Sequence, residues 1–106
     1  MDNHQLNVLF IADIVGRPGI NAVKKHLTAI RQKYEIDLCI ANGENGAGGK
    51  GLTEEIANEY FALGIHVITS GNHIFDKSII YNTLDRNGRI LRPINYPPST
   101  PGHGSY

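Results

Sequence analysis

Side chains able to bind metal ions stand at three places in the sequence, each just after a short apolar run. Asp13 follows the first run, and the neighbours Glu44 and Asn45 follow the second. Asn72 and His73 follow the third. Carboxylate and amide oxygens together with a histidine nitrogen form a ligand mixture that suits Mn, Fe or Zn better than copper. In two-metal phosphoesterases a carboxylate commonly bridges ions about 3.5–4 Å apart, and Glu44 is the candidate bridge.

The apolar runs have the length and composition of strands in a parallel sheet. Residues 8–12, 38–41 and 67–69 are short runs bounded by glycine or polar residues, and the first fits a strand buried on both faces. A fourth short strand is expected at 90–91. These strands would place the polar residues that follow them at one edge of a sheet.

Helical patterns separate the predicted strands. Apolar residues recur at three- and four-residue steps over 20–33, after Pro18, which suits a first helical turn. A second helix is expected over 53–63, begun by a Thr53 cap and stopped by a glycine, and a third from Asp76 to about residue 85. The alternation predicts an α/β fold, a layered sheet of mainly parallel strands with flanking helices and right-handed crossovers.

In such a sheet, ligands bind outside the carboxyl ends of the strands. Neighbouring strands lie about 4.8 Å apart, so parallel pairing brings Asp13, Glu44 and Asn72 together although about thirty residues separate them in sequence. A structural role is the competing interpretation for each residue alone. Asp13 would then cap a turn, Asn45 would support a left-handed backbone position and Asn72 would close an Asx-turn.

A glycine-rich loop follows the second predicted strand. Gly43, Gly46 and Gly48 are candidates for close approach of the backbone to a substrate phosphate or base, and flexible-loop glycine is the competing interpretation. Residues 46–51 also fit G-x-G-x-x-G, so a nucleotide- or dinucleotide-binding regulatory module without catalysis is the alternative function. That match is weak, because it follows the second strand and the next strand ends at Ser70 rather than at an acidic residue.

Bulk composition excludes several classes of protein. The 106 residues hold ten basic and ten acidic side chains, for a net charge of zero, so extended nucleic-acid binding is not expected although a single nucleotide is. The lone Cys39 forms no internal disulfide, and there is no apolar stretch of the roughly 20 residues that a membrane span needs. We expect a cytoplasmic protein, and assembly into a homo-oligomer stays open.

Short motifs stand in a fixed order along the chain: Asp13-Ile14-Val15-Gly16, Asn42-Gly43-Glu44-Asn45, Gly51-Leu52-Thr53, Gly71-Asn72-His73 with Asp76-Lys77, and Arg92-Pro93 with Asn95. In this order and at these separations they resemble the signatures of the YmdB-like family of calcineurin-like metallophosphoesterases. The resemblance extends from about Asn7 to Gly104.

The resemblance implies a binuclear phosphodiesterase that acts on small cyclic nucleotides such as 2′,3′-cyclic AMP. It implies Asp13, Glu44, Asn45 and Asn72 as ligands of two divalent transition-metal ions, Fe or Mn, with Zn or Mg as alternatives. It further implies attack on phosphorus by a metal-bound hydroxide, with His73 as the catalytic histidine that gives a proton to the departing ribose oxygen or stabilises its charge.

The resemblance also implies that residues 1–106 are a single incomplete domain, the amino-terminal half of a four-layer α/β/β/α fold. Family members contribute further histidines from later strands, including a His-x-His pair, and this sequence contains no such pair. We expect the remaining histidines, His4, His26, His66 and His103, to be structural or solvent-facing. The expectation is a fragment, or a chain completed by another chain, that holds its ions weakly and has little activity alone.

Overall fold

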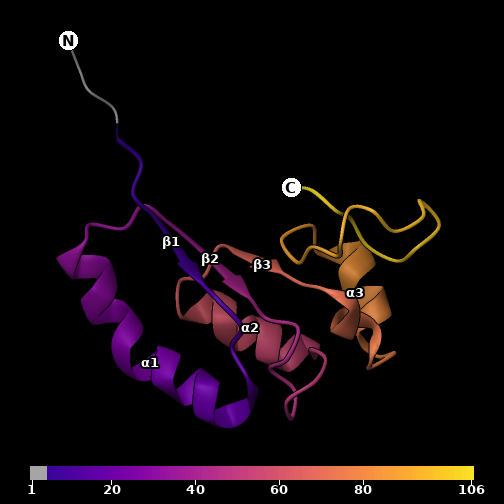
Figure 1. Ribbon diagram of the computed structural model, residues 1–106, viewed down its shortest axis with the longest axis horizontal. Coiled ribbons are helices and arrows are strands. Elements are labelled where there is room, and N and C mark those ends of the chain that lie inside the picture. The colour runs from indigo at the N-terminus through magenta and orange to yellow at the C-terminus, as the bar shows by residue number, and fades with distance from the viewer. Residues whose placement is uncertain (1–4) are drawn as a thin grey trace.

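Three parallel strands form the sheet in a computed structural model that describes residues 5–106 (Figure 1). The strands are β1 (Val8–Ile11), β2 (Leu38–Asn42) and β3 (Val67–Thr69), and they lie side by side in that order. Both pairings are parallel. The predicted α/β class and the positions of the three strands are therefore confirmed.

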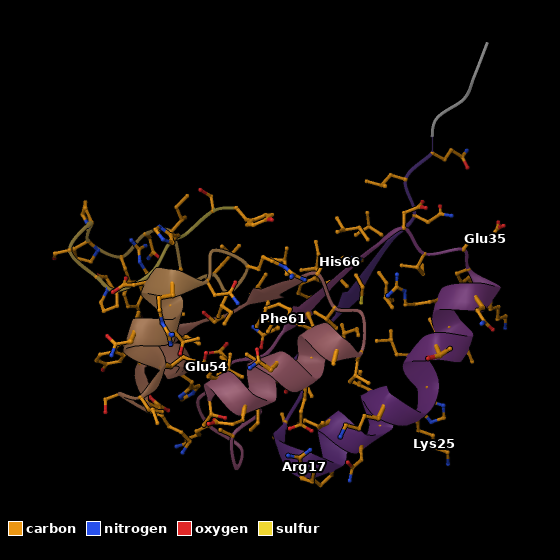
Figure 2. The ribbon with its side chains drawn as sticks, turned by 180° about the vertical axis from the view of Figure 1, so that it is seen from behind. Arg17, Lys25, Glu35, Glu54, Phe61 and His66 are labelled. Carbon is orange, nitrogen blue, oxygen red and sulfur yellow. The ribbon has the colours of Figure 1, made fainter. Side chains whose placement is uncertain are left out.

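Two helices connect the strands and cover one face of the sheet (Figures 1 and 2). They are α1 (Gly16–Lys33), between β1 and β2, and α2 (Glu54–Ala62), between β2 and β3. A strand order that advances in one direction through right-handed crossovers places successive helices on the same face. None of the helices in the described part of the chain has the length and apolar character needed to cross a membrane.

The ends of these helices follow local rules that the sequence carries. Pro18 lies in the first turn of α1, where its missing N–H costs nothing. The Thr53 hydroxyl accepts a hydrogen bond from the Ile56 N–H at 3.3 Å at the start of α2. Gly64 adopts φ +101° directly after that helix, a conformation that side chains disfavour. The predicted Thr53 cap and glycine stop are confirmed.

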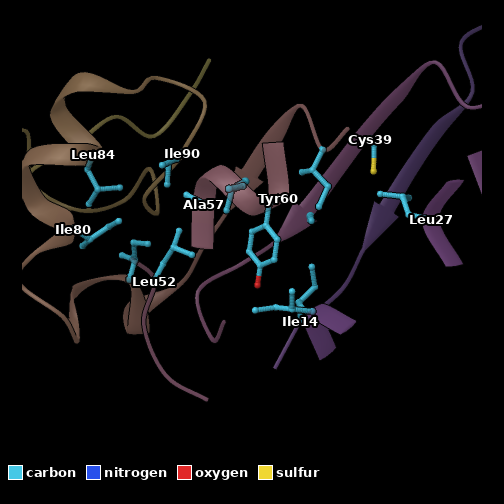
Figure 3. Packing of buried hydrophobic residues seen from close by; sticks show 14 residues of the cluster. Ile14, Leu27, Cys39, Leu52, Ala57, Tyr60, Ile80, Leu84 and Ile90 are labelled. Atoms are coloured by element: carbon cyan, nitrogen blue, oxygen red, sulfur yellow. The ribbon is translucent and has the colours of Figure 1, made fainter. Parts of the chain in front are cut away.

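Part of the core lies between the sheet and the two helices, and the same cluster of buried side chains continues to Ile80, Leu84 and Ile90 (Figure 3). Cys39 and Ala41 of β2 and Ile68 of β3 point to this side and are fully buried. They pack in one cluster with Leu27 of α1 and Tyr60 of α2. Each fully buried large apolar side chain contributes roughly 1.5–3 kcal/mol, so this cluster is the main support of the strand ends described below.

The opposite face of the sheet is open. In the β1–β2 and β2–β3 registers Phe10 pairs with Ile40 and Ile40 with Val67, so these side chains share that face. Phe10 is 55% exposed and Val8 is 49% exposed. The prediction that residues 8–12 are buried on both faces is therefore wrong, because both connecting helices lie on the other side of the sheet.

The segment after β3 also departs from the prediction. Asp76 does not cap an α-helix that runs to about residue 85. Asn72–Phe75 instead forms a 3₁₀ turn, η1, that ends at Asp76, and α3 (Ile80–Arg86) begins later without a side-chain cap. The Asp76 N–H closes the 3₁₀ turn on the His73 carbonyl at 3.0 Å, and this turn places the Asp76 carboxylate 2.8 Å from the His73 ring rather than at a helix cap.

The expected fourth strand at 90–91 is reduced to two single bridges. Ile90 bridges to Ile68 and Leu91 bridges to His103, both in parallel orientation. The chain turns after Arg92 and no ladder develops among the described residues. His103 is exposed, as predicted, while the expectation for His4 lies outside the described residues.

Candidate active site at the strand ends

Backbone hydrogen bonds tie together the loops that leave the three strands. The Ile14 N–H donates to the Asn42 carbonyl at 3.3 Å, and the Gly16 N–H donates to the Asn45 carbonyl at 2.9 Å. On the other side, the Gly43 N–H donates to the Thr69 carbonyl at 3.0 Å. The carboxyl ends of β1, β2 and β3 therefore form one continuous edge that carries the predicted polar residues.

Asp13 and Asn45 meet at this edge. The Asn45 Nδ2 donates to Asp13 Oδ1 at 2.8 Å. Asp13 has φ +38°, whereas Asn45 is not among the residues of positive φ. The left-handed position proposed for Asn45 in the structural interpretation is thus occupied by Asp13. Such a conformation is unfavourable for a residue with a side chain, and strained residues of this kind cluster at functional sites.

Glu44 lies beside the turn that follows β3. Its Oε2 accepts the His73 backbone N–H at 3.0 Å, and its Oε1 accepts from Asn42 Nδ2 at 3.3 Å. A Cβ atom on Gly71 would stand 2.7 Å from Oε1. Only glycine lets the carboxylate approach this turn so closely. The steric role of Gly71 was missed by sequence reasoning, although the residue stands directly before Asn72 and His73.

His73 is held by a second acid that sequence reasoning assigned to another role. Its Nδ1 lies 2.8 Å from Asp76 Oδ2, and the two side chains are 35% and 38% exposed. In a 3₁₀ turn the side chains at positions i and i+3 lie directly above one another, which explains the contact. The spacing of three residues was the available signal, but helix capping was the more familiar explanation for an aspartate at this place.

Asn72 differs from the other predicted ligands in its hydrogen bonding. It opens η1 and is exposed. Its side chain has no hydrogen bond to any of residues 5–106 in the structure. The Asx-turn suggested as its structural alternative is therefore not observed, and its amide oxygen is available to a ligand.

The three candidate glycines fall into two groups. Gly43 and Gly46 pack against Tyr60: a Cβ on Gly43 would lie 3.0 Å from Tyr60 Cε2, and one on Gly46 would overlap the Tyr60 hydroxyl. Gly48 has φ +66° and open space around the position of a Cβ. Close packing on α2 explains the first two, while Gly48 fits a backbone that is exposed to an incoming molecule.

The Tyr60 side chain packs against this loop at Gly43 and Gly46. Its ring is fully buried, and its hydroxyl has no hydrogen-bond partner within the described chain. Burial raises the pKa of the Tyr60 phenol to about 12, so the hydroxyl stays neutral. The Tyr60 ring is therefore an apolar surface against which the turn that carries Glu44 and Asn45 packs.

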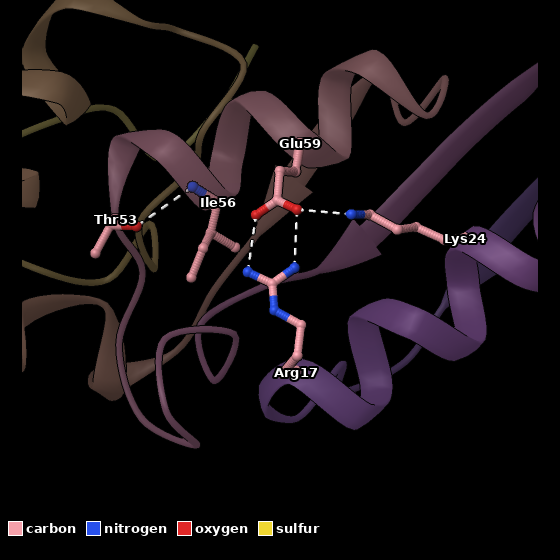
Figure 4. Close-up of polar contacts among 5 residues, drawn as sticks. All are labelled: Arg17, Lys24, Thr53, Ile56 and Glu59. Carbon is pink, nitrogen blue, oxygen red and sulfur yellow. Dashed lines mark hydrogen bonds and ion pairs between the residues drawn. The ribbon is translucent and has the colours of Figure 1, made fainter.

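An ion-pair network on the surface fastens α1 to α2 next to the site (Figure 4). Glu59 accepts from Arg17 Nη1 at 2.8 Å and Nη2 at 3.1 Å, and from Lys24 Nζ at 2.9 Å. Hydrogen bonds from these two cations lower the pKa of Glu59 to about 2. The same pairing raises the pKa of Arg17. Because Arg17 follows Gly16, the network also anchors the loop that contains Asp13.

The donor atoms at the edge fit part of a metal centre. No three His, Cys, Asp or Glu side chains gather into a metal-binding group anywhere in residues 5–106. The edge instead offers two carboxylates and two amides, and Asn45 Oδ1 is buried with no hydrogen-bond partner there. Buried polar atoms without partners are uncommon and call for an explanation. Hard oxygen donors of this kind match divalent ions such as Mn, Fe or Mg.

Comparison with known proteins identifies one matching family and several similar proteins. The sequence pattern of the YmdB-like protein family matches residues 9–106. A Bacillus subtilis (strain 168) protein named 2′,3′-cyclic-nucleotide 2′-phosphodiesterase is 43% identical over 99 residues, which cover 93% of this chain and 38% of that protein. A Mycoplasma genitalium protein named as a putative phosphatase/phosphodiesterase is 37% identical, over 90% of this chain and 33% of that protein.

Solved structures agree with these sequence relatives. A hypothetical protein from Thermus thermophilus superposes with a TM-score of 0.82 at 45% identity, covering 92% of this chain and 37% of that one. A structure described as a novel phosphatase from Mycoplasma pneumoniae superposes with a TM-score of 0.87 at 30% identity, covering 93% and 37%. The chain thus spans between about a third and two fifths of the length of these relatives.

Proposed function

Because the chain belongs to the YmdB-like protein family, we propose that it carries part of the active site of a metal-dependent phosphodiesterase. The substrate class we propose is small cyclic nucleotides such as 2′,3′-cyclic AMP, in keeping with the name of the Bacillus subtilis relative. The observation that carries the proposal is that two strand ends bring oxygen ligands together. Asn45 Nδ2 lies 2.8 Å from Asp13 Oδ1, and Glu44 is the residue next to Asn45 in the sequence.

Asp13, Glu44, Asn45 and Asn72 would hold two divalent ions, Fe or Mn in our proposal, with Zn or Mg as alternatives. Four protein ligands leave coordination positions on two ions for water, substrate or additional protein groups. When bound, such ions lower the pKa of a water molecule towards about 7 and offset negative charge on phosphate oxygens. Glu44 is the proposed bridge, and Asn42 and the His73 backbone fix the orientation of its carboxylate.

In the proposed reaction, His73 of this chain acts on the leaving group, which is a ribose oxygen. Water adds to phosphorus and loses a proton to solvent, while the bond from phosphorus to one ribose oxygen breaks. His73 gives its proton to that oxygen, and the product is a nucleoside monophosphate. The backbone at Gly48 lies open and would approach the phosphate or base, while Gly43 and Gly46 keep the loop seated on Tyr60.

A cytoplasmic location remains part of the proposal. Cys39 is a buried free thiol, and burial raises its pKa. Such a thiol resists oxidation and forms no disulfide with any described residue. A reducing compartment is consistent with that state.

Metal titration followed by a hydrolysis assay tests the function. We expect Mn²⁺ to bind the chain weakly and to be required for its low turnover of 2′,3′-cyclic AMP, with still weaker binding in Glu44→Gln and Asp13→Asn. Glu55→Gln, which removes one charge from an exposed position of α2, is the matched control and should bind as the parent does. If Glu44→Gln and Asp13→Asn retain the parental affinity, the ligand assignment is wrong. Nucleotide binding without turnover would favour a regulatory binding module instead.

A further inference from the structure

His73 is fixed at two points by two different acids. Glu44 Oε2 accepts its backbone N–H at 3.0 Å, and Asp76 Oδ2 lies 2.8 Å from its ring Nδ1. The first contact fixes the position of the residue on the edge of the sheet. The second fixes the rotation of the imidazole ring, since a ring held through one nitrogen presents the other in a defined direction.

The turn that brings His73 and Asp76 together is itself firmly supported. The Asp76 N–H donates to the His73 carbonyl at 3.0 Å and closes the 3₁₀ turn. Within the turn, Ile74 is fully buried. Phe75 packs against Tyr81 with ring centroids 6.0 Å apart, and the Tyr81 hydroxyl donates to the Phe75 carbonyl at 3.2 Å. The geometry of the pair is therefore imposed by the fold rather than by the pair itself.

The chemistry of the two side chains defines which ring nitrogen is presented. An ionised carboxylate only accepts hydrogen bonds, so the contact with Asp76 requires the hydrogen on His73 Nδ1. Nε2 has no hydrogen-bond partner within residues 5–106. We propose that Asp76 is a positioning residue that keeps a hydrogen on His73 Nδ1 in both the neutral and the protonated ring, so that Nε2 faces the departing ribose oxygen and is the nitrogen that gives up a proton.

This inference rests on the proposed function, in which His73 gives a proton to that oxygen. During the step the bond from phosphorus to the ribose oxygen breaks, the oxygen takes the proton that Nε2 carries in the protonated ring, and His73 is left as the neutral Nδ1–H tautomer. A purely stabilising ion pair is the competing explanation. Both side chains are more than a third exposed, and exposed ion pairs contribute little to stability. This explanation therefore predicts that replacing Asp76 leaves the tautomer of the His73 ring unchanged.

Nitrogen-15 NMR of the His73 ring in the metal-free chain separates the two explanations. At alkaline pH, where neutral tautomers are seen, we expect a protonated, pyrrole-type shift at Nδ1 and a pyridine-type shift at Nε2. Asp76→Ala should lose this pattern, whereas Asp76→Asn, which keeps an oxygen acceptor, should retain it. Glu55→Ala removes the same charge elsewhere and should change nothing. Dispersed amide spectra of each variant confirm that the chain is folded.

A pyrrole-type shift at Nε2 in the parent chain, or an unchanged pattern in Asp76→Ala, overturns the inference.

Turnover by the metal-loaded protein gives a second readout. Asp76→Ala should lower kcat for 2′,3′-cyclic AMP about 10- to 100-fold, a part of what a positioned acid contributes, while KM changes little. A p-nitrophenyl phosphodiester, whose leaving group needs no proton, should be much less affected. Equal losses on both substrates contradict the role of Asp76. Absence of turnover in the parent contradicts the proposed function alone, because the NMR result still decides the tautomer.

Discussion

Asn45 Nδ2 donates a hydrogen bond to Asp13 Oδ1 at 2.8 Å across 32 positions of sequence, and this contact joins the loops after β1 and β2. The same two loops are joined in the backbone, where the Gly16 N–H donates to the Asn45 carbonyl. Asp13 is held at positive φ between these contacts. The candidate site is thus arranged by the fold before any ligand arrives, which reduces the ordering that binding requires.

Asn45→Ala should weaken divalent metal binding with little effect on folding. The substitution removes both the hydrogen bond to Asp13 and the buried Oδ1, which has no partner within the described residues. We expect Mn²⁺ affinity to fall about tenfold or more, equivalent to about 1.4 kcal/mol, as measured by calorimetric titration. Asn82→Ala, at an exposed position of α3, is the control. Equal affinity in Asn45→Ala and the parent chain contradicts the assignment.

Gly71→Ala should damage the site through Glu44. The added Cβ would stand 2.7 Å from Oε1, so the carboxylate or the turn before His73 has to move. We expect a loss of roughly 1–3 kcal/mol in urea unfolding together with weaker Mn²⁺ binding. In Gly88→Ala the new Cβ meets only Tyr106 Cδ1 at 3.8 Å, an ordinary contact, so its stability should stay near the parental value. Similar stability losses in the two variants would contradict the steric argument.

Phe10→Ser should reduce self-association of the chain. Phe10 is 55% exposed and belongs to the open face of the sheet, where a groove of about 740 Å³ is lined by Leu38, Ile40 and Val67. Contiguous exposed apolar surface favours association. We expect less light scattering and weaker binding of an apolar fluorescent dye, with an unchanged circular dichroism spectrum. Ala29→Ser, on the exposed side of α1, is a control that should change neither signal.

Glu59→Gln should reduce the loss in the free energy of unfolding that the parent chain shows as the pH falls into the acid range. Because the pKa of Glu59 is lowered from 4.5 to about 2 in the folded chain, its ion pairs contribute fully above about pH 5. That contribution is lost as the pH falls towards 2, where the carboxylate becomes protonated. Water and salt screen the pairs at the surface, so we expect about 1 kcal/mol or less. Urea unfolding at pH 7 and pH 3 measures it, and a parent and variant with identical pH profiles would contradict the assignment.

Local chemistry made much of the fold predictable. Short apolar runs indicated the strands, Thr53 indicated the start of α2, and Gly64 indicated its end, because each signal depends on neighbours in sequence. The exposure of Phe10 was not predictable from periodicity, since it depends on which face of the sheet the helices cover. Parallel topology was enough to predict that the loops after β1 and β2 lie at one edge of the sheet, where the structure shows the hydrogen bond between Asp13 and Asn45.

The contacts around His73 were less accessible from sequence. An aspartate three residues beyond it is consistent with a helix cap as well as with a ring contact, and only the 3₁₀ geometry of η1 distinguishes the two. The steric role of Gly71 depends on the side chain of Glu44, which lies 27 positions earlier in the sequence. Such long-range packing is set by tertiary structure and leaves no periodic pattern.

The contact between Gly46 and Tyr60 yields a prediction that a pair of substitutions tests directly. A Cβ on Gly46 would overlap the Tyr60 hydroxyl, so Gly46→Ala alone should destabilise the chain by roughly 1–3 kcal/mol and displace the turn that carries Glu44 and Asn45. Tyr60→Phe removes a buried hydroxyl that has no hydrogen-bond partner within residues 5–106, so on its own it should be close to neutral or stabilising. In the Tyr60→Phe background, Gly46→Ala should cost less than it does in the parent chain, because the overlapping oxygen is gone. Urea unfolding of the four proteins gives the coupling energy, and strict additivity of the two substitutions would show that the hydroxyl does not limit the position of the loop.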